Sequence, residues 1–148
     1  MSFVLPRSVA AYARVGVESG VESADPHRLI LMLYEGALVA IGRARAAMLA
    51  RDLRTKGESV SRAIQIVEQG LKASLDESAG GELTHQLRSL YDYISERMLF
   101  ASARNEPAGL DEAARLLEQL KGAWEAMPAA ARTQPSPAAA APRLAAPR

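Results

Sequence analysis

The hydrophobic and polar positions of residues 25–42 predict a helix, which continues to about residue 50, but they leave no polar face along this run. Asp25 can cap such a helix, and Pro26 suits its first position. Between Leu29 and Gly42 only Glu35 is charged. At about 100° per residue the apolar side chains point in all directions, so the helix must be covered on all sides. The pattern predicts a helix at the centre of a bundle, or one that keeps a face for a partner.

Three later stretches are amphipathic and predict helices over residues 53–75, 82–104 and 107–127. Asp52 can cap the first, two adjacent glycines precede the second, and prolines bound the third. Ile66 lies off the apolar stripe of its helix, so we expect it to be exposed. The connections between these stretches are short, which favours antiparallel packing of neighbouring helices.

These elements predict an all-α fold, an antiparallel up-down four-helix bundle with a mobile N-terminal arm. No stretch shows the alternation of a β-strand. We expect three parts: an arm over residues 1–24, the bundle over residues 25–127, and a disordered tail over residues 128–148. The tail is almost wholly Ala, Pro and Arg and lacks the apolar bulk for a core.

Composition and charge exclude several classes of protein. The 148 residues contain no cysteine, so there is neither a disulfide nor a thiolate nucleophile. The formal net charge is +1, and subtracting the three arginines of residues 128–148 leaves −2 for the rest. We therefore expect no nucleic-acid partner. No segment is apolar and long enough for membrane insertion, and the N-terminus is not a secretory signal.

The two histidines do not form a convincing chemical site. Glu82 and His85 have the Glu-x-x-His spacing of di-metal bundles, but the chain has no second copy of that motif. A phosphotransfer histidine would stand in mid-helix, whereas His85 and His27 fall in first turns. We expect His27 to be a capping or solvated residue. We therefore expect no metal, no cofactor and no catalytic residue; a histidine phosphotransfer bundle and a self-associating structural bundle remain as alternatives.

The helices over residues 26–50 and 82–104 carry more apolar surface than packing against two neighbours requires. Three pairs of side chains seven residues apart lie off the main stripes, a spacing found where helices meet grooves. Each pair can contact a partner, belong to an unevenly shaped core, or be simply exposed. The pairs are Leu31 with Leu38, Met32 with Val39, and Tyr93 with Phe100.

Several blocks of sequence resemble the signature of the flagellin export chaperone family, FliS, over roughly residues 10–127. The order of the blocks and their spacing also match, although Asp25 replaces the Ser or Thr usual before the family's proline. The blocks are SADPHRLI (residues 23–30), MLYEGA (32–37), GGEL (80–83), LYDY (90–93) and the pattern ending in Trp124.

The resemblance implies a cytosolic chaperone that binds the disordered C-terminal segment of flagellin, prevents premature polymerisation and aids delivery to the export apparatus. It also implies that the N-terminal arm can cover the binding surface, with Tyr12 and Val15 as lid residues. Combining this with the helical pattern, we expect client contacts from Leu31, Met32, Tyr34, Leu38, Val39, Tyr93 and Phe100.

Overall fold

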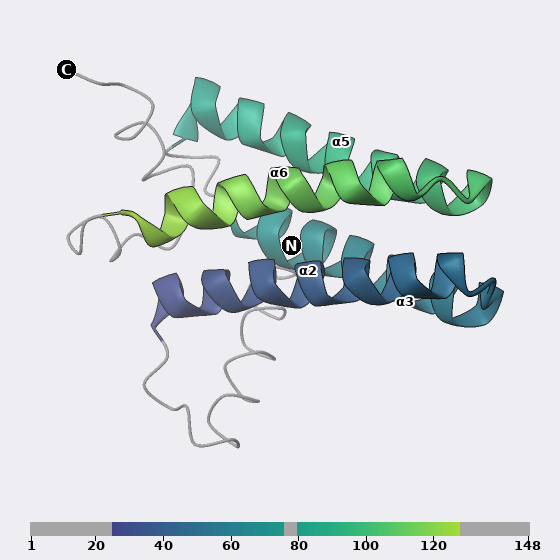
Figure 1. Ribbon diagram of the computed structural model, residues 1–148. Helices are drawn as coiled ribbons and strands as arrows, with labels where there is room; N and C mark the ends of the chain where they lie inside the picture. Colours follow the sequence, from purple (N-terminus) through teal and green to yellow (C-terminus); the bar gives the residue numbers. More distant parts are fainter. Residues whose placement is uncertain (1–24, 76–79, 128–148) are drawn as a thin grey trace.

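The computed structural model describes residues 25–75 and 80–127, and every long element in these ranges is helical (Figure 1). The expected arm and tail, and with them Tyr12 and Val15, lie outside the described residues. The all-α prediction is confirmed: the described ranges contain helices and no strand. The elements are α2 (Pro26–Leu49), α3 (Leu53–Gln65) continued by a π-helix η1 (Ile66–Leu71) and a 3₁₀ turn η2 (Lys72–Ser74), α5 (Glu82–Arg104) and α6 (Pro107–Glu125).

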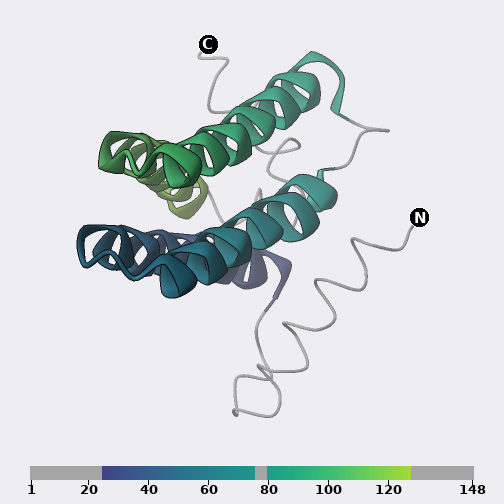
Figure 2. The same cartoon turned by 90° about the vertical axis from the view of Figure 1, so that its right-hand side faces the viewer.

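The helices form two antiparallel pairs that stack on each other. Figure 2 shows α2 with α3 in one layer and α5 with α6 in the other. Helix α2 packs along α3 and α6, and α5 packs along α6 and the α3–η1 segment. Helices α2 and α5 therefore lie diagonally across the bundle, and their outer faces point away from each other.

Local signals fix the starts of α2 and α3, as the sequence predicts. The Asp25 carboxylate accepts a hydrogen bond from the Arg28 amide at 2.8 Å, and Asp52 accepts one from the Thr55 amide at 3.1 Å. The α5–α6 corner depends on a contact from elsewhere in the chain. There the buried Lys56 ammonium donates to the Asn105 side-chain oxygen at 2.7 Å and to a backbone carbonyl at the end of α5.

The α2–α3 contact corrects the prediction for Ile66, which is buried rather than exposed. A Cβ atom added at Gly36 of α2 would lie 3.4 Å from the Ile66 Cδ1 atom. Gly70 of η1 approaches Leu33 even more closely, at 3.0 Å from the corresponding Cβ position. The close approach of η1 to α2 at Gly70 brings Ile66 against α2 and buries it, although it lies off the apolar stripe of its helix.

A hydrogen bond between two buried tyrosines joins the diagonal helices inside the core. The hydroxyls of Tyr34 on α2 and Tyr91 on α5 lie 2.7 Å apart, and both side chains are almost completely buried. Burial raises the pKa of Tyr34 to about 12 and raises the pKa of Tyr91 well above its ordinary value. Both hydroxyls are therefore neutral at physiological pH, and each satisfies the other.

We expect Tyr34→Phe to lower the free energy of unfolding by about 1–3 kcal/mol, because it leaves the Tyr91 hydroxyl buried without its partner. The Tyr34→Phe/Tyr91→Phe double variant should recover most of that loss. Urea denaturation of the four proteins measures the cycle. Losses that simply add would show that the two hydroxyls do not depend on each other.

The same pair predicts a loss of stability at alkaline pH. A tyrosine in the unfolded chain deprotonates near pH 10, whereas folded Tyr34 keeps its proton until about pH 12. Above pH 10 the unfolded state therefore releases protons first, and the free energy of unfolding falls as pH rises toward 12. Denaturation at pH 9 and 11 should show a smaller fall in the double Phe variant; an equal fall would assign the effect to other groups.

Candidate functional site

The surface of the described residues carries six large exposed hydrophobic side chains, three of which the sequence predicts as partner contacts. Val39 on α2 is 57% exposed, and Tyr93 and Phe100 on α5 are 43% and 48% exposed. The pattern does not single out the other three. These are Leu49 and Leu53 beside the α2–α3 turn, and Leu99 on α5.

Val39 belongs to an open groove between α2 and α3, which has a volume of about 610 Å³. Met32 and Val39 are two of its apolar side chains, and Met32 is half-buried. Small residues make up part of its lining and leave space between the two helices. The small residues that line it are Gly36, Ala40, Thr55 and Ser59, and the charged ones are Glu35, Arg43, Glu58 and Arg62.

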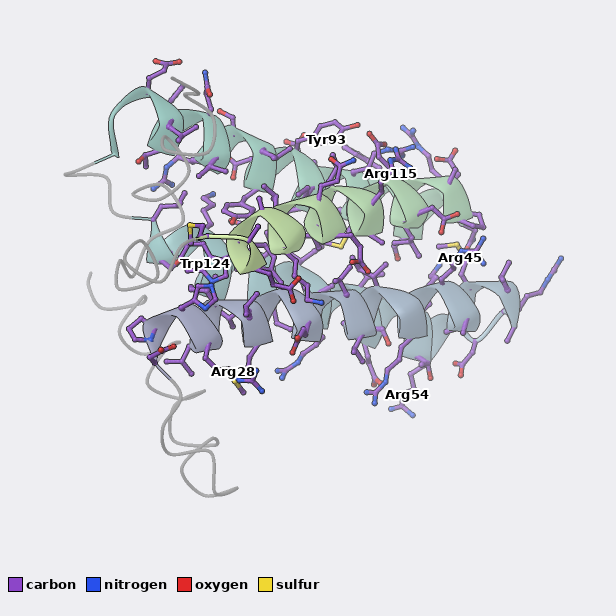
Figure 3. The ribbon with its side chains drawn as sticks, turned by 60° about the vertical axis from the view of Figure 1, so that its left-hand side comes forward. Arg28, Arg45, Arg54, Tyr93, Arg115 and Trp124 are labelled. Atoms are coloured by element: carbon purple, nitrogen blue, oxygen red, sulfur yellow. The ribbon has the colours of Figure 1, made fainter. Side chains whose placement is uncertain are left out.

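Leu38 and Leu31 lie on another side of α2. Leu38 is seven residues before Arg45, and the Arg45 guanidinium donates to Asp111 of α6 at 2.7 Å, so this side of α2 faces α6 (Figure 3). Leu38 is partly buried against the core, and Leu31 is a member of the core with 9% exposure. Of this predicted pair, Leu38 is the member nearer the surface.

Tyr34, which we expected to contact a client, lies in the core with its hydroxyl bonded to Tyr91. In this structure it presents no side-chain surface to a partner. The sequence pattern missed this because Tyr34 can be assigned to the core only when Tyr91, 57 residues away, is known to face it.

The α5 surface combines aromatic rings with a charged cluster. The Tyr93 hydroxyl donates to one Glu112 carboxylate oxygen at 2.7 Å, and the Arg97 guanidinium donates to the other at 2.6 Å. These bonds, from Arg97 first and Tyr93 second, lower the pKa of Glu112. Tyr93 therefore leans toward α6, near Arg115 (Figure 3), while the Phe100 ring lies 5.3 Å from the Arg104 guanidinium.

The structure does not bring the predicted contact residues into one patch. Met32 and Val39 lie in the α2–α3 groove, whereas Tyr93 and Phe100 lie on α5, across the bundle from α2. A single rigid partner surface cannot cover both. An extended or multi-segment partner can contact both by passing around the bundle.

His27 corrects a second prediction, because it is buried rather than solvated or capping. Its ring stacks on Trp124 with ring centres 5.0 Å apart, and Nε2 donates to the Trp124 carbonyl at 3.0 Å. The Trp124 indole N–H returns a hydrogen bond to the His27 carbonyl at 2.9 Å. This reciprocal pair fastens the start of α2 to the end of α6 (Figure 3). Sequence spacing could not reveal it, because the two residues are 97 positions apart.

A metal centre or a membrane-crossing helix would place specific requirements on the described residues. His85 is exposed in the first turn of α5, as predicted. Residues 25–75 and 80–127 contain no group of three or more His, Cys, Asp or Glu side chains placed to hold a metal ion. None of the helices in these ranges has both the length and the apolar character needed to cross a membrane.

Comparison with known proteins places this arrangement in a family. Residues 8–131 match the family described as flagellar protein FliS. The chain belongs to the FliS family. Over 117 residues it is 46% identical to the flagellar secretion chaperone FliS of Salmonella typhimurium strain LT2, which covers 79% of this chain and 87% of the relative. It is 41% identical over 119 residues to FliS of Escherichia coli K12, covering 80% and 88%.

A third relative is the flagellar secretion chaperone FliSB of Pseudomonas aeruginosa PAO1, 37% identical over 119 residues and covering 80% of this chain and 94% of the relative. The resemblance inferred from sequence blocks is therefore confirmed. The structure also shows what several residues of those FliS-like blocks do. Tyr34 and Tyr91 join the diagonal helices, and His27 and Trp124 fasten α2 to α6.

We expect Trp124→Phe to loosen the start of α2. The variant keeps an aromatic ring against His27 but removes the indole donor, which should cost about 1 kcal/mol. In the variant, the first amides of α2 that are hydrogen-bonded within the helix should exchange faster than in the wild type. The amides at the centre of α2 should lose much less protection than these. Unchanged exchange in Trp124→Phe would show that stacking alone holds this end of the bundle.

Proposed function

We propose that this protein is a cytosolic export chaperone that binds the disordered C-terminal segment of flagellin, keeps it from polymerising prematurely and aids its delivery to the flagellar export apparatus. The chain has no catalytic role in this proposal. Membership of the FliS family supports it, since the curated relatives are named flagellar secretion chaperones. The observation that carries it is the apolar surface of α2 that the helices of the bundle leave open in the α2–α3 groove.

The groove suits a partner that becomes ordered as it binds. A disordered segment loses conformational entropy on binding, so each anchor must bury apolar area worth about 25 cal/mol per Å². Val39 and Met32 are seven residues apart on one face of α2 and offer such an area. They can receive the apolar row of a helix or an extended segment.

The α5 surface supplies the second set of contacts in the proposal. Tyr93 and Phe100 lie across the bundle from the groove, so a flagellin segment that uses both surfaces must wrap around the protein. Leu38 can extend the contacts on the α6 side of α2. We assign the buried Leu31 and Tyr34 to the packing beneath this surface rather than to direct contact with the client.

The proposed role of the N-terminal arm is to compete with the client through Tyr12 and Val15. Both residues lie outside the described part of the chain, so the role rests on the family resemblance. Deleting residues 1–20 should raise the affinity for a flagellin C-terminal segment. Equal affinities with and without the arm would remove the lid from the proposal.

We expect Val39→Glu to lower the affinity for a flagellin C-terminal segment at least about tenfold, which corresponds to about 1.4 kcal/mol. The substitution removes an apolar anchor and places a carboxylate where the client must exclude water. Isothermal titration calorimetry measures the affinity. Because Val39 is exposed in the free protein, the variant should keep the wild-type stability.

The matched control is Leu53→Glu, which makes the same kind of change at a side chain that is 65% exposed and does not line the groove. It should bind as the wild type does. Equal weakening in both variants, or none in Val39→Glu, would contradict the proposed site. Sedimentation of the client-free protein tests the alternative that these surfaces serve self-association; a stable oligomer that dissociates in Val39→Glu would favour it.

A further inference from the structure

Arg43 on α2 and Arg62 on α3 line the two opposite walls of the groove. We propose that they select client segments in which Asp or Glu residues stand on both sides of the apolar residues that enter the groove. The inference rests on the proposed function and names the chemistry of the segment that the groove accepts. It follows from how the four charges of the groove are paired and where they stand along it.

The two acidic side chains of the groove already have basic partners that do not line it. Glu35 pairs with Lys121 of α6 at 3.9 Å, and Glu58 pairs with Arg54 at 3.6 Å. In the ranges that the structure describes, neither Arg43 nor Arg62 forms an ion pair. The two guanidinium groups are thus the charges that the groove leaves without an opposite charge in contact.

Both arginines stand close to Val39, the exposed apolar side chain of the groove, when positions along the two helices are compared. Arg43 is one turn beyond Val39 on the same helix, so the two side chains are neighbours on α2. Arg62 follows the start of α3 at Leu53 by nine residues, and Val39 precedes the end of α2 at Leu49 by ten. In an antiparallel pair joined by a short turn, Arg62 therefore stands about level with Val39 on the other wall.

A client side chain that packs on Val39 brings its neighbours within reach of both guanidinium groups. If those neighbours are Asp or Glu, each can form charge-assisted hydrogen bonds, and the forked guanidinium can bind a carboxylate through two of them. The same bonds gain strength as the client excludes water from the groove. A segment with Lys or Arg at these places meets like charges and is disfavoured. The arginines therefore act on selectivity, while Met32 and Val39 supply the apolar contact.

The test uses the full chain and a flagellin C-terminal segment, with calorimetry at several salt concentrations. We expect the Arg43→Glu/Arg62→Glu double variant to bind at least about thirtyfold more weakly at low salt. The control is Arg51→Glu, which reverses one charge at an exposed residue of the α2–α3 turn that does not line the groove; it is compared with each single variant, Arg43→Glu and Arg62→Glu, as well as with the double variant. It should stay within about twofold of the wild type. The wild-type affinity should fall as salt rises, and that of the double variant should not.

A second arm of the experiment changes the client instead. Replacing the Asp and Glu residues of the segment by Asn and Gln should weaken binding to the wild type. It should strengthen binding to the double variant, because it removes the repulsion between the client's carboxylates and the two introduced glutamates. If the double variant binds like the wild type while Val39→Glu still weakens binding, the charge inference is wrong and the proposed function stands. If the segment does not bind the wild type at all, the proposed function fails and this inference fails with it.

Discussion

The structure depends on one constraint: helix α2 carries apolar side chains on more sides than a single neighbouring helix can cover. Helix α3 and η1 cover one side, and Gly70 lets η1 approach Leu33 of α2 closely. Helix α6 covers another side, and the His27–Trp124 pair fixes its end against the start of α2. The remaining apolar strip, in the α2–α3 groove, is what the four-helix arrangement leaves over, and it is the basis of the proposed binding function.

The residues that identify the family and the residues that we assign to the client do different things. The sequence blocks that resemble FliS contribute Tyr34, Tyr91 and Trp124 to contacts inside the bundle. These contacts set the relative positions of α2, α5 and α6. The proposed client contacts at Val39 and Phe100 lie on the outside of that frame, at positions where a side chain can change without disturbing the core. Because these internal contacts hold the bundle in place before binding, it is the client segment, in the proposed function, that becomes ordered when the two associate.

The sequence predicts the starts of α2 and α3 well because they depend on local chemistry. Asp25 and Asp52 cap as expected, since a capping carboxylate needs only the amides of the next turn. The predictions fail where burial depends on a distant helix. Ile66 is covered by α2 across Gly36, and His27 is covered by Trp124, so neither position can be assigned from helical periodicity alone. The π-helical turn of η1 likewise has no local signal that we recognise in the sequence.

The central claim is that the α2–α3 groove is where the client binds. The most direct measurement is methyl NMR of the full chain during titration with a flagellin C-terminal segment. The account predicts that the methyl signals of Met32 and Val39 shift, because both line the groove, while the methyl signal of the fully buried Met98 changes little. Saturable binding that leaves the signals of Met32 and Val39 unchanged would contradict the account.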